Sequence, residues 1–216
     1  GIVGESCSGK STLANIIMNL EKADSGTVLL NNKDITNIKS NKLKEIYKDI
    51  QMVFQDAIGS FNPRFTIEES IMEYVCNLCS TTEADKKHKV DNLLQMVGLS
   101  KEYKYRYPHE LSGGQCQRAA IARALSAHPK ILVCDEATSA LDVSVQAQIV
   151  ELLKEMQEKM NISYLFITHD LALVSSFCDR VAVMKNGKIV EVGDAKEVIN
   201  NPKDEYTKLL IKSAYF

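Results

Sequence analysis

The sequence lacks the basic excess that is typical of nucleic-acid-binding proteins. Of its 216 residues, 26 are Lys or Arg and 28 are Asp or Glu, so the formal net charge is −2. The basic run at residues 86–89 is short and is typical of a solvated helix face rather than of a phosphate-binding stripe. We therefore expect no nucleic-acid partner.

Long hydrophobic runs and a secretory signal are also absent from the sequence. The longest apolar stretches, such as residues 164–167, are far shorter than the roughly 20 residues that a membrane-spanning helix needs. No internal repeat or low-complexity segment is visible either. We therefore expect any membrane role to come through a partner protein.

The cysteines have no spacing that is typical of a disulfide framework. Six are scattered along the chain, namely Cys7, Cys76, Cys79, Cys116, Cys134 and Cys178. Their distribution indicates free thiols in a reducing cytosol. Cys76 and Cys79 form a single C-x-x-C inside a helical pattern, and without a second pair this favours a structural role over a metal site.

A glycine-containing loop at residues 4–11 carries the clearest chemistry in the chain. It reads G-E-S-C-S-G-K-S and fits the phosphate-binding loop of nucleotide hydrolases. Such a loop turns backbone N–H groups inward around a polyanion, with Lys10 near the β- and γ-phosphates and the Ser11 hydroxyl on Mg²⁺. The residues of this loop are Gly4, Glu5, Ser6, Cys7, Ser8, Gly9, Lys10 and Ser11.

The remaining pattern alternates short apolar strands with amphipathic helices, which predicts an α/β fold. We expect helices from the loop to near residue 23, at 66–79 after a capping box, and at 83–97, 117–127, 143–160 and 170–177, with two short helices around Pro202. We expect strands at 27–30, 33–35, 50–54, 131–134 and 162–168, and a hairpin of 181–184 with 188–192 around Asn186 and Gly187. Two successive helices without a strand between them indicate a helical subdomain inserted in the core.

Two further motifs complete the expected site. Asp135 and Glu136 follow a buried strand, where the first carboxylate would orient Mg²⁺ and the second would polarise the attacking water. Residues 111–115, L-S-G-G-Q, place a hydroxyl and two glycine amides at a helix N-terminus, which makes a second anion cradle. One ATP does not need two cradles from one subunit, so we expect a head-to-tail pair in which the second cradle closes on the partner's nucleotide.

With these motifs, the sequence resembles the nucleotide-binding domain of an ABC ATPase over almost its whole length. Residues 4–11 match the Walker A loop, 131–135 Walker B, 111–115 the signature motif and 139–142 the D-loop. The resemblance implies ATP and Mg²⁺ as ligands, and Glu136, His169 and Gln55 as the catalytic residues. It also implies Ser11, Gln55 and Asp135 at the metal. The residues that it implies at ATP are those of the phosphate loop, from Gly4 to Ser11, and Thr12, Ser112, Gly113, Gly114, Gln115 and Asp142.

The fold that this resemblance implies is a P-loop NTPase (RecA-like) core with a mostly parallel sheet and an inserted α-helical subdomain. Residues 1–55 and 117–192 would form the ATP-binding core, 56–116 the helical subdomain ending in the signature motif, and 193–216 a helical tail. Because the phosphate loop begins at residue 4, we expect the N-terminal antiparallel β part, with its adenine-stacking aromatic residue, to be truncated. Adenine binding and dimerisation should then be weakened.

A finer resemblance concerns the peptide and nickel importer subfamily. Residues 54–64, F-Q-D-A-I-G-S-F-N-P-R, resemble its Q-loop segment, with Ala57 in place of a proline, and residues 201–210 resemble its N-P-x-H-P-Y-T tail. This resemblance implies that the chain is the ATP-hydrolysing subunit of an importer for peptides, nickel or a metal–ligand complex. Such a subunit would be a peripheral protein at the cytoplasmic face of the cell membrane. Its partners would be two transmembrane permease subunits, a second ATPase subunit and, indirectly, an extracytoplasmic substrate-binding protein.

Other functions remain as alternatives. A soluble ABC ATPase acting on nucleic acid, ribosomes or iron–sulfur assembly shares the motifs, but the acidic balance and the importer-like segment disfavour it. A non-hydrolysing regulatory half-site is disfavoured by the intact Gln55, Asp135, Glu136 and His169. Cys7 occupies a loop position usually held by a small residue such as Gly, and we hypothesise that it makes the ATPase sensitive to thiol reagents.

Overall fold

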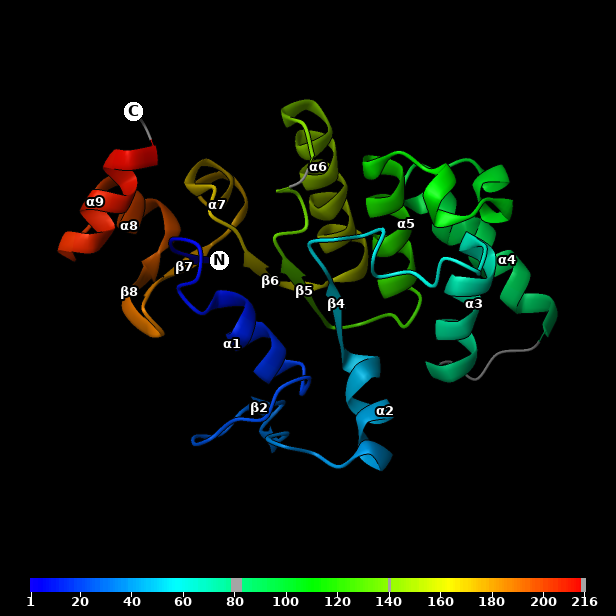
Figure 1. Ribbon diagram of the computed structural model, residues 1–216, viewed down its shortest axis with the longest axis horizontal. Helices are drawn as coiled ribbons and strands as arrows, with labels where there is room; N and C mark the ends of the chain where they lie inside the picture. Colours follow the sequence, from blue (N-terminus) through cyan, green and yellow to red (C-terminus); the bar gives the residue numbers. More distant parts are fainter. Residues whose placement is uncertain (79–82, 140, 215–216) are drawn as a thin grey trace. The chain divides into compact units, whose positions relative to one another are not determined.

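The computed structural model describes residues 1–78, 83–139 and 141–214, and Figure 1 shows their helices and strands. The chain divides into two compact units. The first comprises Gly1–Asn37, Val133–Glu136 and Tyr164–Phe216, and the second comprises Ile38–Leu132 and Ala137–Ser163. The functional division that the sequence predicts, into an ATP-binding core, a helical subdomain and a tail, stays a prediction.

The sheet of the first unit is built around its shortest strand, β1 (Ile2–Val3). This strand pairs in parallel with β6 (Ser163–Ile167) on one side and with β7 (Arg180–Lys185) on the other. The chain then turns at Asn186 and Gly187, which both have positive φ, into the antiparallel strand β8 (Lys188–Asp194). The hairpin predicted from these two residues is therefore confirmed, because both can adopt the left-handed backbone of a tight turn.

The complete strand order is β4-β5-β6-β1-β7-β8. Strand β4 (Ile50–Val53) belongs to the second unit, and β5 (Ile131–Asp135) contributes residues to both units. The strands beside β1 read as nearly continuous apolar runs, as buried parallel strands do. The predicted α/β fold with a mostly parallel sheet is confirmed.

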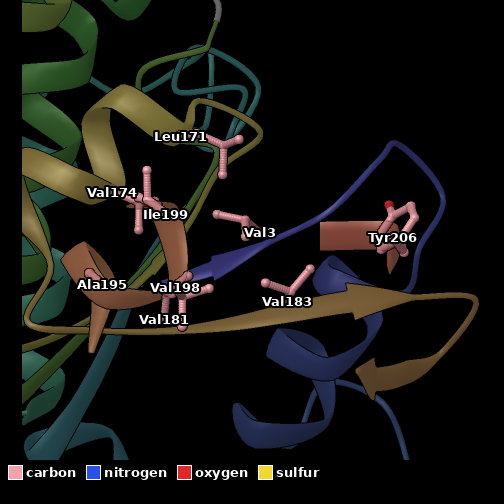
Figure 2. Packing of buried hydrophobic residues seen from close by; sticks show 9 residues of the cluster. All are labelled: Val3, Leu171, Val174, Val181, Val183, Ala195, Val198, Ile199 and Tyr206. Atoms are coloured by element: carbon pink, nitrogen blue, oxygen red, sulfur yellow. The ribbon is translucent and has the colours of Figure 1, made fainter. Parts of the chain in front are cut away.

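Three helices cover this sheet in the first unit: α7 (Leu171–Phe177), α8 (Ala195–Asn200) and α9 (Glu205–Ala214). Their apolar side chains join those of β1 and β7 in one buried cluster, drawn in Figure 2. Each fully buried valine or leucine of such a cluster stabilises the fold by about 1.5–3 kcal/mol. The cluster consists of Val3, Leu171, Val174, Val181, Val183, Ala195, Val198, Ile199 and Tyr206.

The first helix ends earlier than its sequence pattern predicts. Helix α1 spans Lys10–Ile17, so the expectation that it reaches residue 23 is wrong. Asn19 adopts a left-handed backbone, which Asn tolerates better than most residues, and its side-chain amide donates to the carbonyl of Ile35 over 3.0 Å. This bond ties the helix end to the antiparallel pair β2 (Leu29–Leu30) and β3 (Lys33–Asp34), whose prediction is confirmed.

The second unit is mainly helical. It contains α2 (Ser40–Asp49), α3 (Ile67–Leu78), α4 (Glu83–Met96), two 3₁₀ segments, η1 (Lys101–Tyr105) and η2 (Pro108–Glu110), then α5 (Gly113–Leu125) and α6 (Val143–Met160). The predicted capping box opens α3, because the Glu69 N–H donates to the Thr66 hydroxyl and the Thr66 N–H donates to the Glu69 carboxylate.

Helix α5 starts four residues before its predicted start at Gln117. Ser112 and Gln115 form a second capping box: the Gln115 N–H donates to Ser112 Oγ over 3.3 Å, and the Ser112 N–H donates to Gln115 Oε1 over 3.0 Å. This box offsets the low helix propensity of the two glycines that form the first turn. The signature segment therefore opens the helix, as the sequence predicts, and its residues 113–115 form the first turn.

One buried arginine joins α5 to the segment that follows Gln55. The Arg123 guanidinium donates to the carbonyl and to the hydroxyl of Ser60 over 2.7 and 2.8 Å. It also lies 4.2 Å from the ring centroid of Phe61 and 5.2 Å from that of Tyr74, within the range of cation–π attraction. Residues 60–61 are thereby fixed to the signature helix.

Two remaining expectations concern the membrane and the paired cysteines. Within the described ranges, no helix is both long enough and apolar enough to cross a bilayer. Cys76 is exposed near the end of α3, whereas Cys79 lies outside the described residues. The expectation for the C-x-x-C pair therefore stays a prediction.

Candidate nucleotide site

The backbone of the phosphate loop requires glycine at its two ends. A Cβ atom on Gly4 would lie 2.1 Å from the carbonyl oxygen of Met184, a distance that no side chain tolerates. Gly9 has φ 101° and forms the N-cap of α1, a conformation that side chains with a Cβ rarely adopt. Gly4 therefore lets the loop lie close against β7, and Gly9 supplies the left-handed backbone from which α1 begins.

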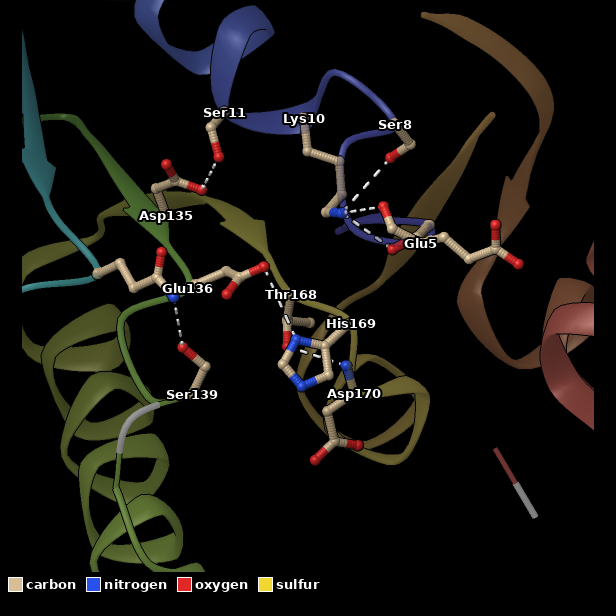
Figure 3. Close-up of polar contacts among 12 residues, drawn as sticks. Glu5, Ser8, Lys10, Ser11, Asp135, Glu136, Ser139, Thr168, His169 and Asp170 are labelled. Atoms are coloured by element: carbon tan, nitrogen blue, oxygen red, sulfur yellow. Dashed lines mark hydrogen bonds and ion pairs between the residues drawn. The ribbon is translucent and has the colours of Figure 1, made fainter. Parts of the chain in front are cut away.

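Lys10 places a positive charge inside this loop. Its side chain is almost fully buried, and Nζ donates to the carbonyl oxygens of Gly4 and Glu5 over 2.9 and 2.8 Å (Figure 3). Ser8 Oγ lies 3.4 Å from the same ammonium. Neutral acceptors thus hold the ammonium where the pattern predicts that phosphate oxygens bind.

Ser11 and Asp135 bring the phosphate loop to the end of β5. The Ser11 hydroxyl donates to Asp135 Oδ1 over 3.1 Å. Burial raises the pKa of Asp135, the Ser11 bond acts in the opposite direction, and the neighbouring Glu136 carboxylate raises the pKa further. A hydroxyl and a carboxylate are hard oxygen ligands of the kind that Mg²⁺ prefers, so these residues fit that ion.

Glu136 and His169 lie together at the ends of β5 and β6. The Glu136 N–H donates to the carbonyl of Ile167 over 2.9 Å, and Glu136 Oε1 lies 3.7 Å from His169 Nδ1 (Figure 3). Glu136 has φ 47°, a left-handed backbone that is uncommon for residues with a side chain and that clusters at functional sites. The first unit therefore brings together the phosphate loop, Asp135, Glu136 and His169.

The second unit holds Gln55 and the D-loop residues. Gln55 follows β4, and its Nε2 lies 3.5 Å from Ser139 Oγ. Asp142 caps α6, since its carboxylate accepts from the Ser144 hydroxyl over 2.6 Å and from the Val145 N–H over 3.0 Å. These two bonds lower the pKa of Asp142. Position 140 of the expected D-loop lies outside the described residues, and the nucleotide roles of Gln55 and Asp142 stay predictions.

Of the two signature glycines, Gly114 is explained by packing. A Cβ on Gly114 would lie 2.6 Å from Val145 Cγ1 on α6, so the close approach of α5 and α6 requires glycine there. Gln115 Nε2 donates to the hydroxyl of Tyr103 over 2.9 Å. Ser112 and Gly113 are exposed at the start of α5, which leaves the N–H groups of this turn accessible to a ligand.

The structure adds three supports of the phosphate loop that the motifs do not predict. The carbonyl of Met184 lies against Gly4, and the Gly187 N–H donates to the Ser8 carbonyl over 2.8 Å. The Glu5 N–H donates to the hydroxyl of Tyr206 over 3.1 Å. The only sequence signal for any of these supports is the importer-like tail at residues 201–210, which contains Tyr206 but does not indicate a role for it.

The fold and this loop define a P-loop protein that is built to bind a nucleotide. A family model described as ABC transporter matches residues 1–139, and the chain therefore belongs to the ABC transporter family. It is 48% identical over 214 residues to the oligopeptide transport ATP-binding protein OppF of Salmonella typhimurium, which covers 99% of this chain and 64% of that relative. It is 45% identical over 216 residues to the dipeptide transport ATP-binding protein DppF of Lactococcus lactis, covering 99% and 69%.

Solved structures show the same architecture. The chain matches cbiO1 from Clostridium perfringens, part of the ABC transporter complex cbiONQ, with TM-score 0.81 and 34% identity over 93% of this chain and 78% of that one. It matches the dimeric ATP-binding cassette MJ0796, bound to ADP and Pi in a post-hydrolysis state, with TM-score 0.80 and 31% identity over 90% and 84%. The chain spans about two thirds of the length of the oligopeptide and dipeptide transport relatives named above, 64% in the case of OppF.

Proposed function

We propose that this chain binds and hydrolyses ATP as part of an ABC importer of peptides. The observation that carries the proposal is the arrangement in the first unit, where Lys10 lies inside the glycine loop and Ser11 contacts Asp135. The similarity to OppF and DppF, an oligopeptide and a dipeptide transport protein, supports peptides as the transported solute. Nickel and metal–ligand complexes, which the sequence also allowed, have no comparable support among these relatives.

Each residue of the site has a proposed role in hydrolysis. The N–H groups of the loop and the Lys10 ammonium would bind the β- and γ-phosphates, and Ser11 and Asp135 would hold Mg²⁺. Bound Mg²⁺ would neutralise charge that develops on the phosphates. The Glu136 carboxylate polarises the attacking water, and His169 contacts the γ-phosphate and helps to hold the transition state.

We further propose that the active form is a head-to-tail dimer, peripheral at the cytoplasmic face of the membrane. Ser112, Gly113 and Gly114 of one subunit would close on the nucleotide of the other. The accessible first turn of α5 and the dimeric state of the MJ0796 cassette support this arrangement. Two permease subunits would be the direct partners, and an extracytoplasmic substrate-binding protein would act through them.

Affinity purification of the tagged full-length protein from detergent-solubilised membranes tests the importer. We expect two multi-span membrane proteins to co-purify, and vesicles that contain the complex to take up a labelled oligopeptide only when ATP is supplied. Recovery in the soluble fraction alone, or with ribosomes or nucleic acid, would contradict import and favour the soluble ABC ATPase. Uptake of nickel without uptake of peptide would correct the solute.

A further inference from the structure

We propose that Tyr206 is a positioning residue of the phosphate loop, which acts through one peptide group to keep Lys10 in place. The inference deepens the proposed function and rests on ATP binding at this loop. It assigns a role to the tail at residues 201–210, which no catalytic motif includes.

The peptide group between Gly4 and Glu5 is hydrogen-bonded at both of its edges. Its N–H donates to the Tyr206 hydroxyl over 3.1 Å, and its carbonyl accepts from Lys10 Nζ over 2.9 Å. Because a peptide group is planar, these two bonds fix its rotation together. A rotation of this group would withdraw the carbonyl from the ammonium, so the phenol helps to set the resting position of Lys10.

The ring of Tyr206 is itself firmly held. It is 7% exposed and belongs to the buried cluster of β1, β7, α7 and α8 (Figure 2). The Lys185 ammonium lies 4.5 Å from the ring centroid, within cation–π range. The hydroxyl therefore reaches the loop from a rigid support, and the hydrogen bond costs little side-chain entropy.

The backbone before Tyr206 is anchored to β8. The Glu191 carboxylate accepts from the N–H groups of Lys203 and Asp204 over 2.9 and 3.1 Å. Asp204 Oδ1 in turn accepts from the N–H groups of Tyr206 and Thr207, over 2.8 and 3.4 Å, and so opens α9. Hydrogen bonds to charged acceptors are stronger than neutral ones, so this turn directs Tyr206 at the loop reproducibly.

A purely structural role for Tyr206 makes a different prediction. If only the ring mattered, phenylalanine could replace tyrosine without changing the affinity for ATP, since phenylalanine packs in the same cluster. If the hydroxyl positions the loop, phenylalanine should cost no more stability than the loss of one hydrogen bond and should also weaken nucleotide binding. The two roles therefore separate in a comparison of affinity with melting temperature.

Equilibrium binding in the full-length protein tests the proposal. A fluorescent ATP analogue with Mg²⁺ is titrated into the Glu136→Gln variant, which blocks turnover, with and without Tyr206→Phe. We expect Tyr206→Phe to raise Kd about fivefold to tenfold, and to lower the melting temperature without nucleotide by no more than about 1–6 °C, the loss typical of one hydrogen bond. The control is Tyr105→Phe, at an exposed tyrosine of η1, and it should bind the analogue normally.

The outcomes distinguish this inference from the proposed function. An unchanged Kd in Tyr206→Phe, with or without a lower melting temperature, would overturn the positioning role alone. Absence of binding in the Glu136→Gln background would overturn the ATP site itself. Should Tyr206→Phe fail to fold, Glu191→Gln replaces it: by loosening the turn it should also raise Kd, and a normal Kd there would overturn the proposal.

Discussion

Ser11 Oγ donates a hydrogen bond to Asp135 Oδ1 over 3.1 Å, although 124 residues separate the two in the sequence. The first turn of α1 supplies the hydroxyl, and the end of β5 supplies the carboxylate. Two motifs recognised independently in the sequence thus form one cluster of oxygen ligands in the first unit. The proposed metal and phosphate chemistry depends on this contact.

Asp135→Asn should raise stability at neutral pH in the absence of nucleotide. Burial raises the pKa of Asp135, so the folded state binds its proton more tightly than the unfolded state does. The stability of the wild type therefore falls as the pH rises from the pKa of aspartate in the unfolded chain to the raised pKa of Asp135 in the folded protein. The extra stability of Asp135→Asn should therefore shrink as the pH is lowered through the pKa of Asp135. It should vanish below about pH 4, which is the pKa of aspartate in an unfolded chain.

Thermal melts of the wild type and of Asp135→Asn at a series of pH values, with and without Mg²⁺ and ATP, measure this difference in stability. Mg²⁺ with ATP should stabilise the wild type more than Asp135→Asn, which lacks a charged ligand. A variant that is less stable than the wild type at pH 7 without nucleotide would contradict the account of Asp135.

Cys7→Gly should stabilise the protein slightly. Cys7 is exposed and has φ 62°, a left-handed backbone that costs a residue with a side chain about 1–2 kcal/mol. Glycine removes this strain but loses about 0.5–1 kcal/mol to its greater freedom when unfolded, so the net gain should be at most about 1.5 kcal/mol, or roughly 3–6 °C. Cys7→Ala, which keeps the strain, is the control. Equal melting temperatures of the two variants would be inconsistent with strain at this position.

Arg123→Lys should destabilise the second unit. Lysine cannot donate to both the carbonyl and the hydroxyl of Ser60 from one planar group, and it loses the stacking on Phe61. The loss of one charge-assisted bond costs about 1.5–3 kcal/mol, which corresponds to a fall of roughly 3–12 °C in melting temperature. The exposed Arg180→Lys serves as the control, and a similar fall in both variants would speak against a special role of Arg123.

The sequence predicts the elements whose ends depend on local signals. Helix α6 begins and ends as expected, because Asp142 caps its first turn and Asn161 adopts a left-handed backbone after its last. The end of α1 could not be predicted in the same way, since Asn19 is held by a bond to the carbonyl of Ile35 in the following hairpin. Local periodicity contains no information about that contact.

The same distinction applies to the candidate site. Lys10, Ser11 and Asp135 are recognisable because phosphate and metal chemistry require those residue types at those positions. The supports of the loop could not be found in this way, since the Glu5–Tyr206 bond joins residues 201 positions apart and uses a backbone N–H. Every residue except proline has a backbone N–H, so the residue type at position 5 does not indicate that it bonds to a hydroxyl.

Phosphate release by the full-length protein, measured with ATP and Mg²⁺, tests the central claim most directly. We predict steady hydrolysis by the wild type and none by Glu136→Gln, which should still bind ATP with similar affinity because the loop and Lys10 are untouched. Glu155→Gln, at an exposed carboxylate of α6, should hydrolyse ATP normally. Equal turnover in the wild type and Glu136→Gln would contradict the assignment of the catalytic carboxylate and the mechanism built on it.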